Sequence, residues 1–140
     1  MTQHLAPPAI QDEKEILLRQ VHPAQFPDGK PSKEAFVPSD RDEGMLSTLR
    51  ERVGAKEAYR RWTEDHTRLS VGTFGIEVSE IHGENLTALD DAEFIPLADH
   101  ASVDFTSVPT KGQRKQIGRR FRDAAVSRGC LFTPPTPDSE

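Results

Sequence analysis

The chain has 140 residues, of which 34% are hydrophobic and 29% charged, and its formal net charge is −5. A chain of this length favours one domain with one modest hydrophobic core. A single cysteine excludes an intramolecular disulfide, and no apolar run approaches the roughly 18 residues of a membrane span. Since the sequence also begins without a basic, apolar leader, we expect a cytoplasmic protein.

The first part of the chain predicts short strands separated by proline-rich loops. Residues 1–14 are polar and interrupted by prolines, so we expect a flexible N-terminal tail there. The apolar run 15–21 ends at a His-Pro pair and is typical of a largely buried strand. Two further apolar segments, 35–37 and 45–49, are also predicted to be short strands.

The middle of the chain predicts one helix followed by strands. Between residues 55 and 66 the apolar residues follow the helical period. We expect this face to pack against the sheet and to be largely buried; it consists of Ala55, Ala58, Tyr59, Trp62 and His66. Residues 70–81 alternate between apolar and polar side chains, which predicts a half-buried strand. A short edge strand is expected at 93–97, and a further half-buried strand at 101–105.

The last helix has the clearest start and stop signals. Thr110 followed by Gln113 matches a capping box, and Gly129 supplies a left-handed stop. The apolar stripe between them consists of Ile117, Phe121, Ala124 and Ala125. We expect Cys130 to be buried, because it follows a helix C-terminus and has apolar neighbours.

The order of these elements predicts a single α+β domain over residues 15–132, followed by a flexible C-terminal tail at 133–140. We expect a small antiparallel or mixed sheet with two main helices packed on one face. The order is too irregular for a doubly wound parallel sheet.

Charge is distributed unevenly along the chain. Residues 106–130 carry seven basic residues and a single acidic one, whereas the rest of the chain is acidic. At 100° per residue, Lys115, Arg119 and Arg122 fall on the outward side of the last helix. They predict a docking face for a partner protein or a phosphate-bearing ligand. The alternative is a solvated face that balances the acidic body.

Nucleic acid is disfavoured as the partner of this face. No aromatic residue interleaves with these charges on the outward side of the helix, and the isoelectric point is near 5.5. The expected partner is therefore another protein, such as one encoded nearby. We expect a non-catalytic accessory module that needs no cofactor and no metal, since the sequence contains no Walker loop, zinc-type Cys/His spacing or Gly-rich dinucleotide loop.

His100, Ser102 and Asp104 are residues of the types found in hydrolases, but their spacing argues against a catalytic triad. Residues two apart on a strand lie about 6.5–7 Å apart, whereas a nucleophile and its base must approach to about 2.6–3.2 Å. A solvated polar sheet face is the simpler interpretation. The alternative is that His100 meets Glu77 across adjacent strands and forms an acid/base pair.

Three groups of residues support a resemblance. They are Leu18–Pro23 with Ser32, Ala35-Phe36, Pro38 and Leu46-Ser47; then Ser70–Gly72; and then His100–Phe105. On these segments the chain resembles a group of small bacterial proteins that have no assigned activity, which implies a bacterial origin and a stand-alone domain. Arg19 followed by Val21-His22-Pro23 is also similar to the opening strand of RES-type and other ADP-ribosyltransferase-like toxins. The Gly-rich segment that follows this strand in RES members is absent here.

The second resemblance implies an alternative function. In those toxins a basic residue on an early strand and an acid on a later one flank the nicotinamide ribose of NAD. The alternative is thus an NAD-using enzyme, or a phosphoester hydrolase, built on Arg19, His22, Glu77 and His100.

Overall fold

A computed structural model describes residues 6–135, without the side chain of Arg41. The outer parts of both expected tails, 1–5 and 136–140, lie outside the described residues. Five antiparallel strands form one curled sheet in the order β3-β1-β2-β5-β4. They are β1 (Ile16–Gln20), β2 (Met45–Leu49), β3 (Thr73–Glu77), β4 (Thr87–Leu89) and β5 (His100–Asp104).

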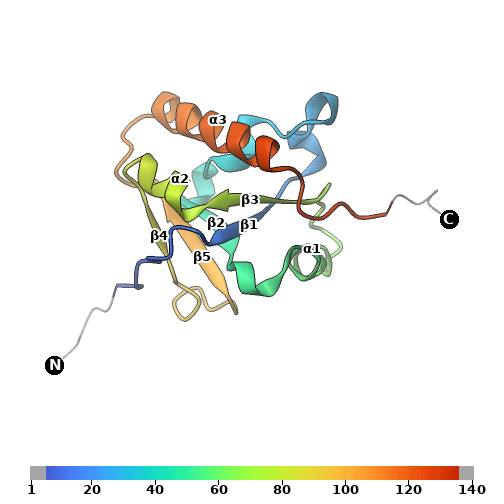
Figure 1. Ribbon diagram of the computed structural model, residues 1–140, viewed down its shortest axis with the longest axis horizontal. Coiled ribbons are helices and arrows are strands. Elements are labelled where there is room, and N and C mark those ends of the chain that lie inside the picture. The colour runs from blue at the N-terminus through green and yellow to red at the C-terminus, as the bar shows by residue number, and fades with distance from the viewer. Residues whose placement is uncertain (1–5, 136–140) are drawn as a thin grey trace.

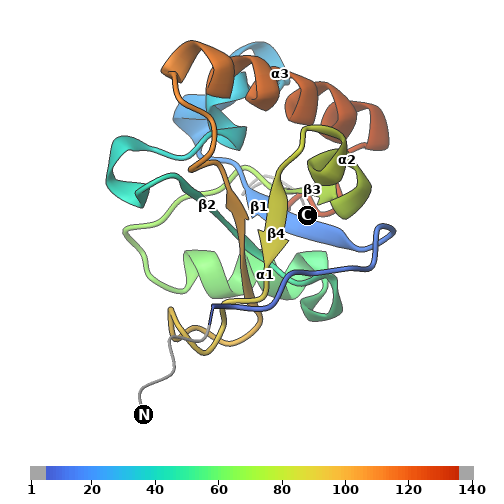
Figure 2. The same cartoon turned by 90° about the vertical axis from the view of Figure 1, so that its left-hand side faces the viewer.

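Three α-helices accompany the sheet: α1 (Ala55–Thr63), α2 (Val78–Gly83) and α3 (Lys111–Arg128). The predicted α+β class is therefore confirmed. The two longer helices were expected on one face, but Figures 1 and 2 show α3 above the sheet and α1 below it. None of the helices in the described chain is long and apolar enough to cross a bilayer.

The main core lies between the sheet and α3. Leu17 of β1, Ile76 of β3 and Val103 of β5 point into it and are fully buried. Phe121 of α3 meets Phe105 edge-on, with ring centroids 6.1 Å apart. Such aromatic pairs contribute about 0.5–1.5 kcal/mol beyond the burial of their area. The connection between β1 and β2 is a chain of short 3-10 turns, one of which (Lys33–Phe36) fills the space between the sheet and α3.

Both outer strands of the sheet are paired with terminal segments of the chain. Ala9 forms a bridge with Leu89 of β4, and Ile10 is buried in the core. Part of the segment expected as an N-terminal tail is thus packed against the domain. At the opposite edge, Thr73 of β3 forms a bridge with Phe132.

Helix α3 begins and ends where the sequence predicts. The Thr110 hydroxyl accepts a hydrogen bond from the Gln113 amide at 3.1 Å, and the chain leaves the helix at Gly129 with φ of 98°. The apolar side of α3 packs closely against the turn Lys33–Phe36, because Gly118 has no side chain to keep them apart. A Cβ at Gly118 would lie 2.3 Å from Cγ2 of Val37.

Three strand predictions are wrong. Residues 35–37 belong to the 3-10 turn Lys33–Phe36 and its cap, not to a strand. The strand predicted over 70–81 ends at Glu77, because Glu77 and Glu80 form a reciprocal capping box that starts α2. Residues 93–97 form turns with exposed side chains, and the edge strand is β4 instead.

Three burial predictions are also wrong. Trp62 is only half-buried, with its indole N–H donating to the Leu69 carbonyl and Arg68 stacked over the ring. His66 lies beyond the end of α1 and is exposed. Cys130 is exposed as well, because the chain after Gly129 runs along the surface beside β3.

Two glycines of α3 provide a test of this packing. Gly118→Ala should lower the free energy of unfolding by roughly 1–3 kcal/mol, because the added methyl group overpacks the contact with Val37 and the Lys33 carbonyl. Gly112→Ala, whose Cβ would meet nothing within 4 Å, should stabilise the protein by up to about 1 kcal/mol through helix propensity. Urea denaturation measures both. Stabilisation by both substitutions would contradict the close approach of α3 to the 3-10 turn.

Candidate functional site

The structure does not assemble the four residues of the predicted enzyme site. Glu77 pairs with Ile16 at one end of β1, whereas His22 follows the other end of that strand. His22 lies six residues after Ile16 along an extended chain, which corresponds to about 20 Å. Strands β1 and β2 also stand between β3 and β5, so Glu77 cannot meet His100 across adjacent strands.

Two of the four residues have local capping roles. The Glu77 side chain accepts a hydrogen bond from Ser79 within the first turn of α2. The exposed His22 accepts from the Ala24 amide through Nδ1 at 2.9 Å and caps a 3-10 turn. These hydrogen bonds explain both side chains without a ligand.

Arg19 bridges a gap between β1 and β2. The two strands pair only at Leu18 and Leu49, and the Arg19 guanidinium donates to the carbonyls of Ser47 (2.9 Å) and Ala35 (2.8 Å) beyond that point. Burial lowers the pKa of Arg19 to about 10, although the charge of Asp42 acts in the opposite direction. Arg19 is thus a structural cation that satisfies backbone carbonyls.

His100 lies at the centre of a hydrogen-bonded relay on the sheet face opposite the main core. Its Nδ1 is 2.6 Å from Oδ1 of Asp91, and its Nε2 is 2.5 Å from Oγ of Ser47. The second oxygen of Asp91 accepts from the Ser102 hydroxyl at 2.5 Å. The side chains of His100 and Asp91 are only 5% and 8% exposed. We call Ser47, His100, Asp91 and Ser102 the serine relay.

The relay joins three segments. Ser47 lies opposite Ser102 in the β2–β5 pair, and His100 is two residues from Ser102 on the same face of β5. Asp91 comes from the loop between β4 and β5, immediately after the β4 edge. If Asp91 is ionised it can only accept, which places a proton on Nδ1 of His100. A neutral imidazole then accepts from the Ser47 hydroxyl through Nε2.

The sequence pointed to His100 and Ser102 but not to their partners. Asp91 lies in an irregular acidic stretch without periodicity, and Ser47 is 53 residues from His100 in the sequence. Only the register of β2 against β5 brings Ser47 into reach. The argument that three neighbours on one strand cannot form a triad still holds, since Asp104 takes no part and bonds Thr106 instead.

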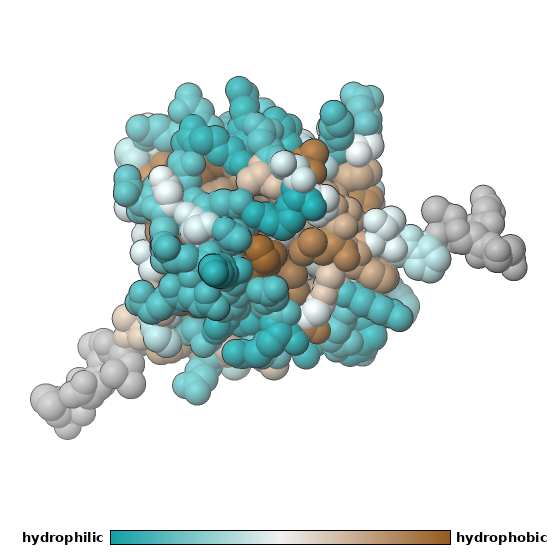
Figure 3. Space-filling model, in the orientation of Figure 1, coloured by the Kyte–Doolittle hydropathy of each residue, from teal (hydrophilic) through white to brown (hydrophobic). Residues whose placement is uncertain are grey.

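A second candidate site is a basic groove beside α3. Arg119 and Arg122 of α3 form one wall, and the loop that contains Lys30 and Lys33 forms the other. The hollow has a volume of about 670 Å³ and also borders Asp28 and Glu34. Figure 3 shows mainly hydrophilic side chains along the upper edge of the molecule, over α3.

Six of the seven basic residues of α3 divide into two sets, and the seventh, Arg114, donates to the Val108 carbonyl at 3.1 Å. Arg120 and Arg128 bind Glu84 (2.6 Å) and Glu80 (2.5 Å), and Lys111 lies 3.4 Å from Asp40. This first set holds α3 to the acidic body, as the solvated-face alternative requires.

The second set consists of the three predicted partner-binding residues. Lys115 and Arg119 are exposed, and among the described residues neither has a carboxylate within 4 Å. Arg122 is half-buried and pairs with its neighbour Asp123. This part of the helix therefore carries positive charge that the fold leaves largely uncompensated.

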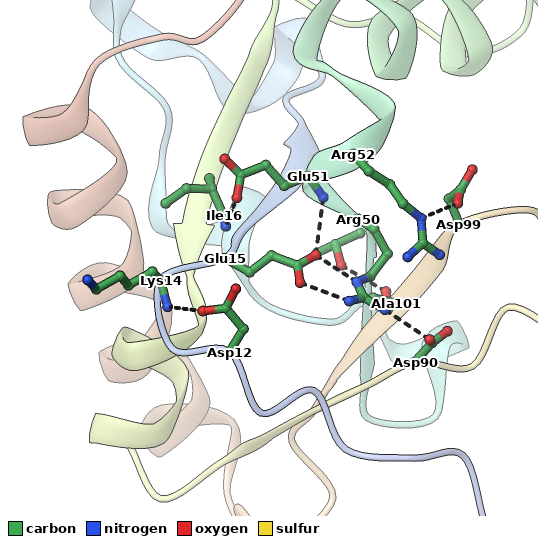
Figure 4. A network of polar contacts seen from close by, with 11 residues as sticks. Asp12, Lys14, Glu15, Ile16, Arg50, Glu51, Arg52, Asp90, Asp99 and Ala101 are labelled. Carbon is green, nitrogen blue, oxygen red and sulfur yellow. Dashed lines mark hydrogen bonds and ion pairs between the residues drawn. The ribbon is translucent and has the colours of Figure 1, made fainter.

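A network of ion pairs centred on Arg50 holds the loop that supplies Asp91 (Figure 4). The Arg50 guanidinium binds Glu15 through two nitrogens, at 2.6 and 2.8 Å, and Asp90 at 2.9 Å. The hydrogen bond from Arg50 is the largest of the effects that lower the pKa of Glu15 below its ordinary value. The network fixes Asp90, and hence the start of the loop that carries Asp91.

The lowered pKa of Glu15 gives the stability a defined pH dependence. Because the folded pKa lies below the ordinary 4.5, ionised Glu15 stabilises the fold above that pH. This contribution is lost as the pH falls through the folded pKa. Glu15→Gln should lower the free energy of unfolding by roughly 1.5–3 kcal/mol near neutral pH, and the difference from wild type should vanish in acid.

Urea denaturation across this pH range measures the effect, with Glu93→Gln as the exposed control. A Glu15→Gln deficit that is independent of pH would contradict an ionic role for Glu15.

Comparisons with protein-family models, with curated proteins and with solved structures find no significant match to this chain. The serine relay and the basic groove are therefore the two features from which a function can be inferred.

Proposed function

We propose that the chain is an accessory module that binds an acidic segment of a partner protein in the basic groove. The observation that carries this proposal is that Lys30, Lys33, Arg119 and Arg122, from two separate segments, line the same hollow. We also propose that the protein is bacterial and that it works in the cytoplasm.

Charge balance supports an acidic partner. The body of the protein is acidic, yet Lys115, Arg119 and Arg122 follow one another at intervals of four and three residues along one side of α3. Like charges so placed repel one another, and an exposed pair such as Arg122–Asp123 is worth only about 0–1 kcal/mol. Carboxylates of a partner would relieve this repulsion. Each could also accept two parallel hydrogen bonds from the guanidinium of Arg119 or Arg122.

The shape of the groove favours an extended segment over a compact ligand. It is an open hollow along α3, and a second, smaller one lined by Lys30, Arg122 and Val126 continues it toward the helix C-terminus. A peptide could therefore lie along the helix, with acidic side chains toward the arginines and an apolar side chain at Val126.

Reversal of charge at the two groove arginines and at Lys115, one helical turn before Arg119, tests the proposal. Lys115→Glu, Arg119→Glu and Arg122→Glu together should leave the melting temperature nearly unchanged and abolish binding. Binding of a fluorescent peptide of alternating Glu and Ala is measured by anisotropy, and wild-type affinity should fall steeply with added salt because exposed charges are screened beyond about 8 Å.

The control variant carries the same change in net charge elsewhere: Lys14→Glu, Lys56→Glu and Lys111→Glu. It should bind the peptide with nearly the affinity of wild type. Equal losses in both triple variants would show that overall charge alone attracts the peptide, and wild-type protein that binds no peptide even at low salt would reject the groove as a docking site.

A further inference from the structure

The serine relay has the connectivity of an activated nucleophile. A catalytic serine needs a base within about 2.6–3.2 Å and a third group that orients that base. Ser47 Oγ is 2.5 Å from Nε2 of His100, and Asp91 holds the opposite nitrogen at 2.6 Å. The Ser102 hydroxyl holds the second oxygen of Asp91, so the carboxylate itself is fixed at both ends.

The four residues of the serine relay differ in burial, and the orienting residues are more deeply buried than the serine that would react. Asp91, Ser102 and His100 are buried, whereas Ser47 is only partly buried on the face of β2 away from the main core. The orienting groups are thus shielded from water, where their hydrogen bonds are stronger, and Ser47 is the most exposed of the four residues.

From this geometry we propose that Ser47 is a nucleophilic serine, activated by His100, that attacks carboxylic esters. Ser47 Oγ forms a bond to the carbonyl carbon while its proton passes to Nε2 of His100. The bond from that carbon to the leaving alkoxide then breaks, and His100 returns the proton to the leaving oxygen. Water attacks the acyl-serine by the same route and releases the acid. His100 and Ser47 are catalytic residues here, and Asp91 and Ser102 are positioning residues.

The surroundings favour an uncharged acyl group over a phosphoester. Arg19, which donates to the Ser47 carbonyl, is occupied by backbone carbonyls. The other arginines near the relay are paired with carboxylates: Arg50 with Glu15 and Asp90, and Arg52 and Arg61 with Asp99 beside His100. The loop between Asp91 and His100 instead exposes apolar side chains. These are Phe94, Ile95 and Leu97, each about half exposed.

Acylation by 4-nitrophenyl acetate tests the proposal. Because the exposed Cys130 would also react with this ester, all proteins carry Cys130→Ala. One acetyl group should attach to Ser47, located by peptide mass spectrometry, with an initial burst of one equivalent of nitrophenol before slower turnover. Ser47→Ala should remove this adduct, and His100→Asn should slow its formation by roughly 10²–10⁴-fold. Ser107→Ala, at an exposed turn, should change nothing.

A thiol at the same position provides a second, independent measurement. Ser47→Cys should react with iodoacetamide faster than Ser107→Cys does, because His100 takes the proton of the thiol, and His100→Asn should abolish the difference. Acetylation scattered over lysines, with equal rates in wild type and Ser47→Ala, would reduce the relay to a structural network. The same conclusion would follow if the Ser47→Cys thiol reacted with iodoacetamide no faster than the Ser107→Cys thiol.

Proton NMR tests the role of Asp91, because its signal distinguishes a hydrogen bond to His100 from a general contribution to folding. A hydrogen bond from Nδ1–H of His100 to a buried carboxylate should give a downfield imidazole proton that exchanges slowly with water. Asp91→Asn should remove this resonance and slow acylation of Ser47 while the protein stays folded. A resonance that persists in Asp91→Asn would remove Asp91 from the relay.

Discussion

The arrangement of this protein depends on one constraint, the pairing of Arg50 with both Glu15 and Asp90. Arg50 follows β2, Glu15 precedes β1 and Asp90 follows β4, so one guanidinium gathers the ends of three strands at one side of the sheet. Its amide also donates to the Asp99 carbonyl at 2.8 Å, which fixes the start of β5. Removal of either carboxylate would leave a partly buried cation without one of its partners. The resulting loss in free energy of unfolding exceeds the net stabilisation that the ion pair itself provides.

This anchoring explains why polar groups can occupy the adjacent sheet face. Ser47, His100 and Ser102 would be ordinary exposed residues on an unsupported antiparallel sheet. Because the loop 90–99 is held at both ends, Asp91 lies over β5, where it contacts His100 and Ser102. Among the described residues, every buried side-chain nitrogen and oxygen has a hydrogen-bond partner. A network satisfied in this way is rigid, whereas a partly satisfied one would be destabilising.

The sequence predicts the elements whose periodicity or capping is local, and it fails where a tertiary contact decides. Helix α3 could be located because Thr110 and Gly129 act within a few residues. Ala35 and Phe36 have an apolar pattern that fits a strand, but they are buried against α3 in a 3-10 turn, and only that contact selects the turn. Helical spacing places Trp62 on the apolar face of α1, yet the short helix leaves it half-exposed.

The same division holds for the two sites. The outward positions of Arg119 and Arg122 follow from helix geometry, but Lys30 and Lys33 join them only because the preceding 3-10 turns return to α3. His100 and Ser102 could be recognised on one strand face. Asp91 and Ser47 could not be found, because their positions depend on a loop anchor and on a strand register that no local pattern encodes.

The pairing of the outer strands with the terminal segments limits how other molecules can approach. An open edge strand offers a row of unpaired amides and carbonyls to which another chain can add a strand, in specific recognition or in aggregation. Here the Pro8 carbonyl and the Ile10 amide occupy that position beside β4, and Leu131 and Phe132 occupy it beside Thr73 of β3. Where the two segments lie, neighbouring molecules meet side chains instead of a free backbone, so association there has to rely on charge and shape.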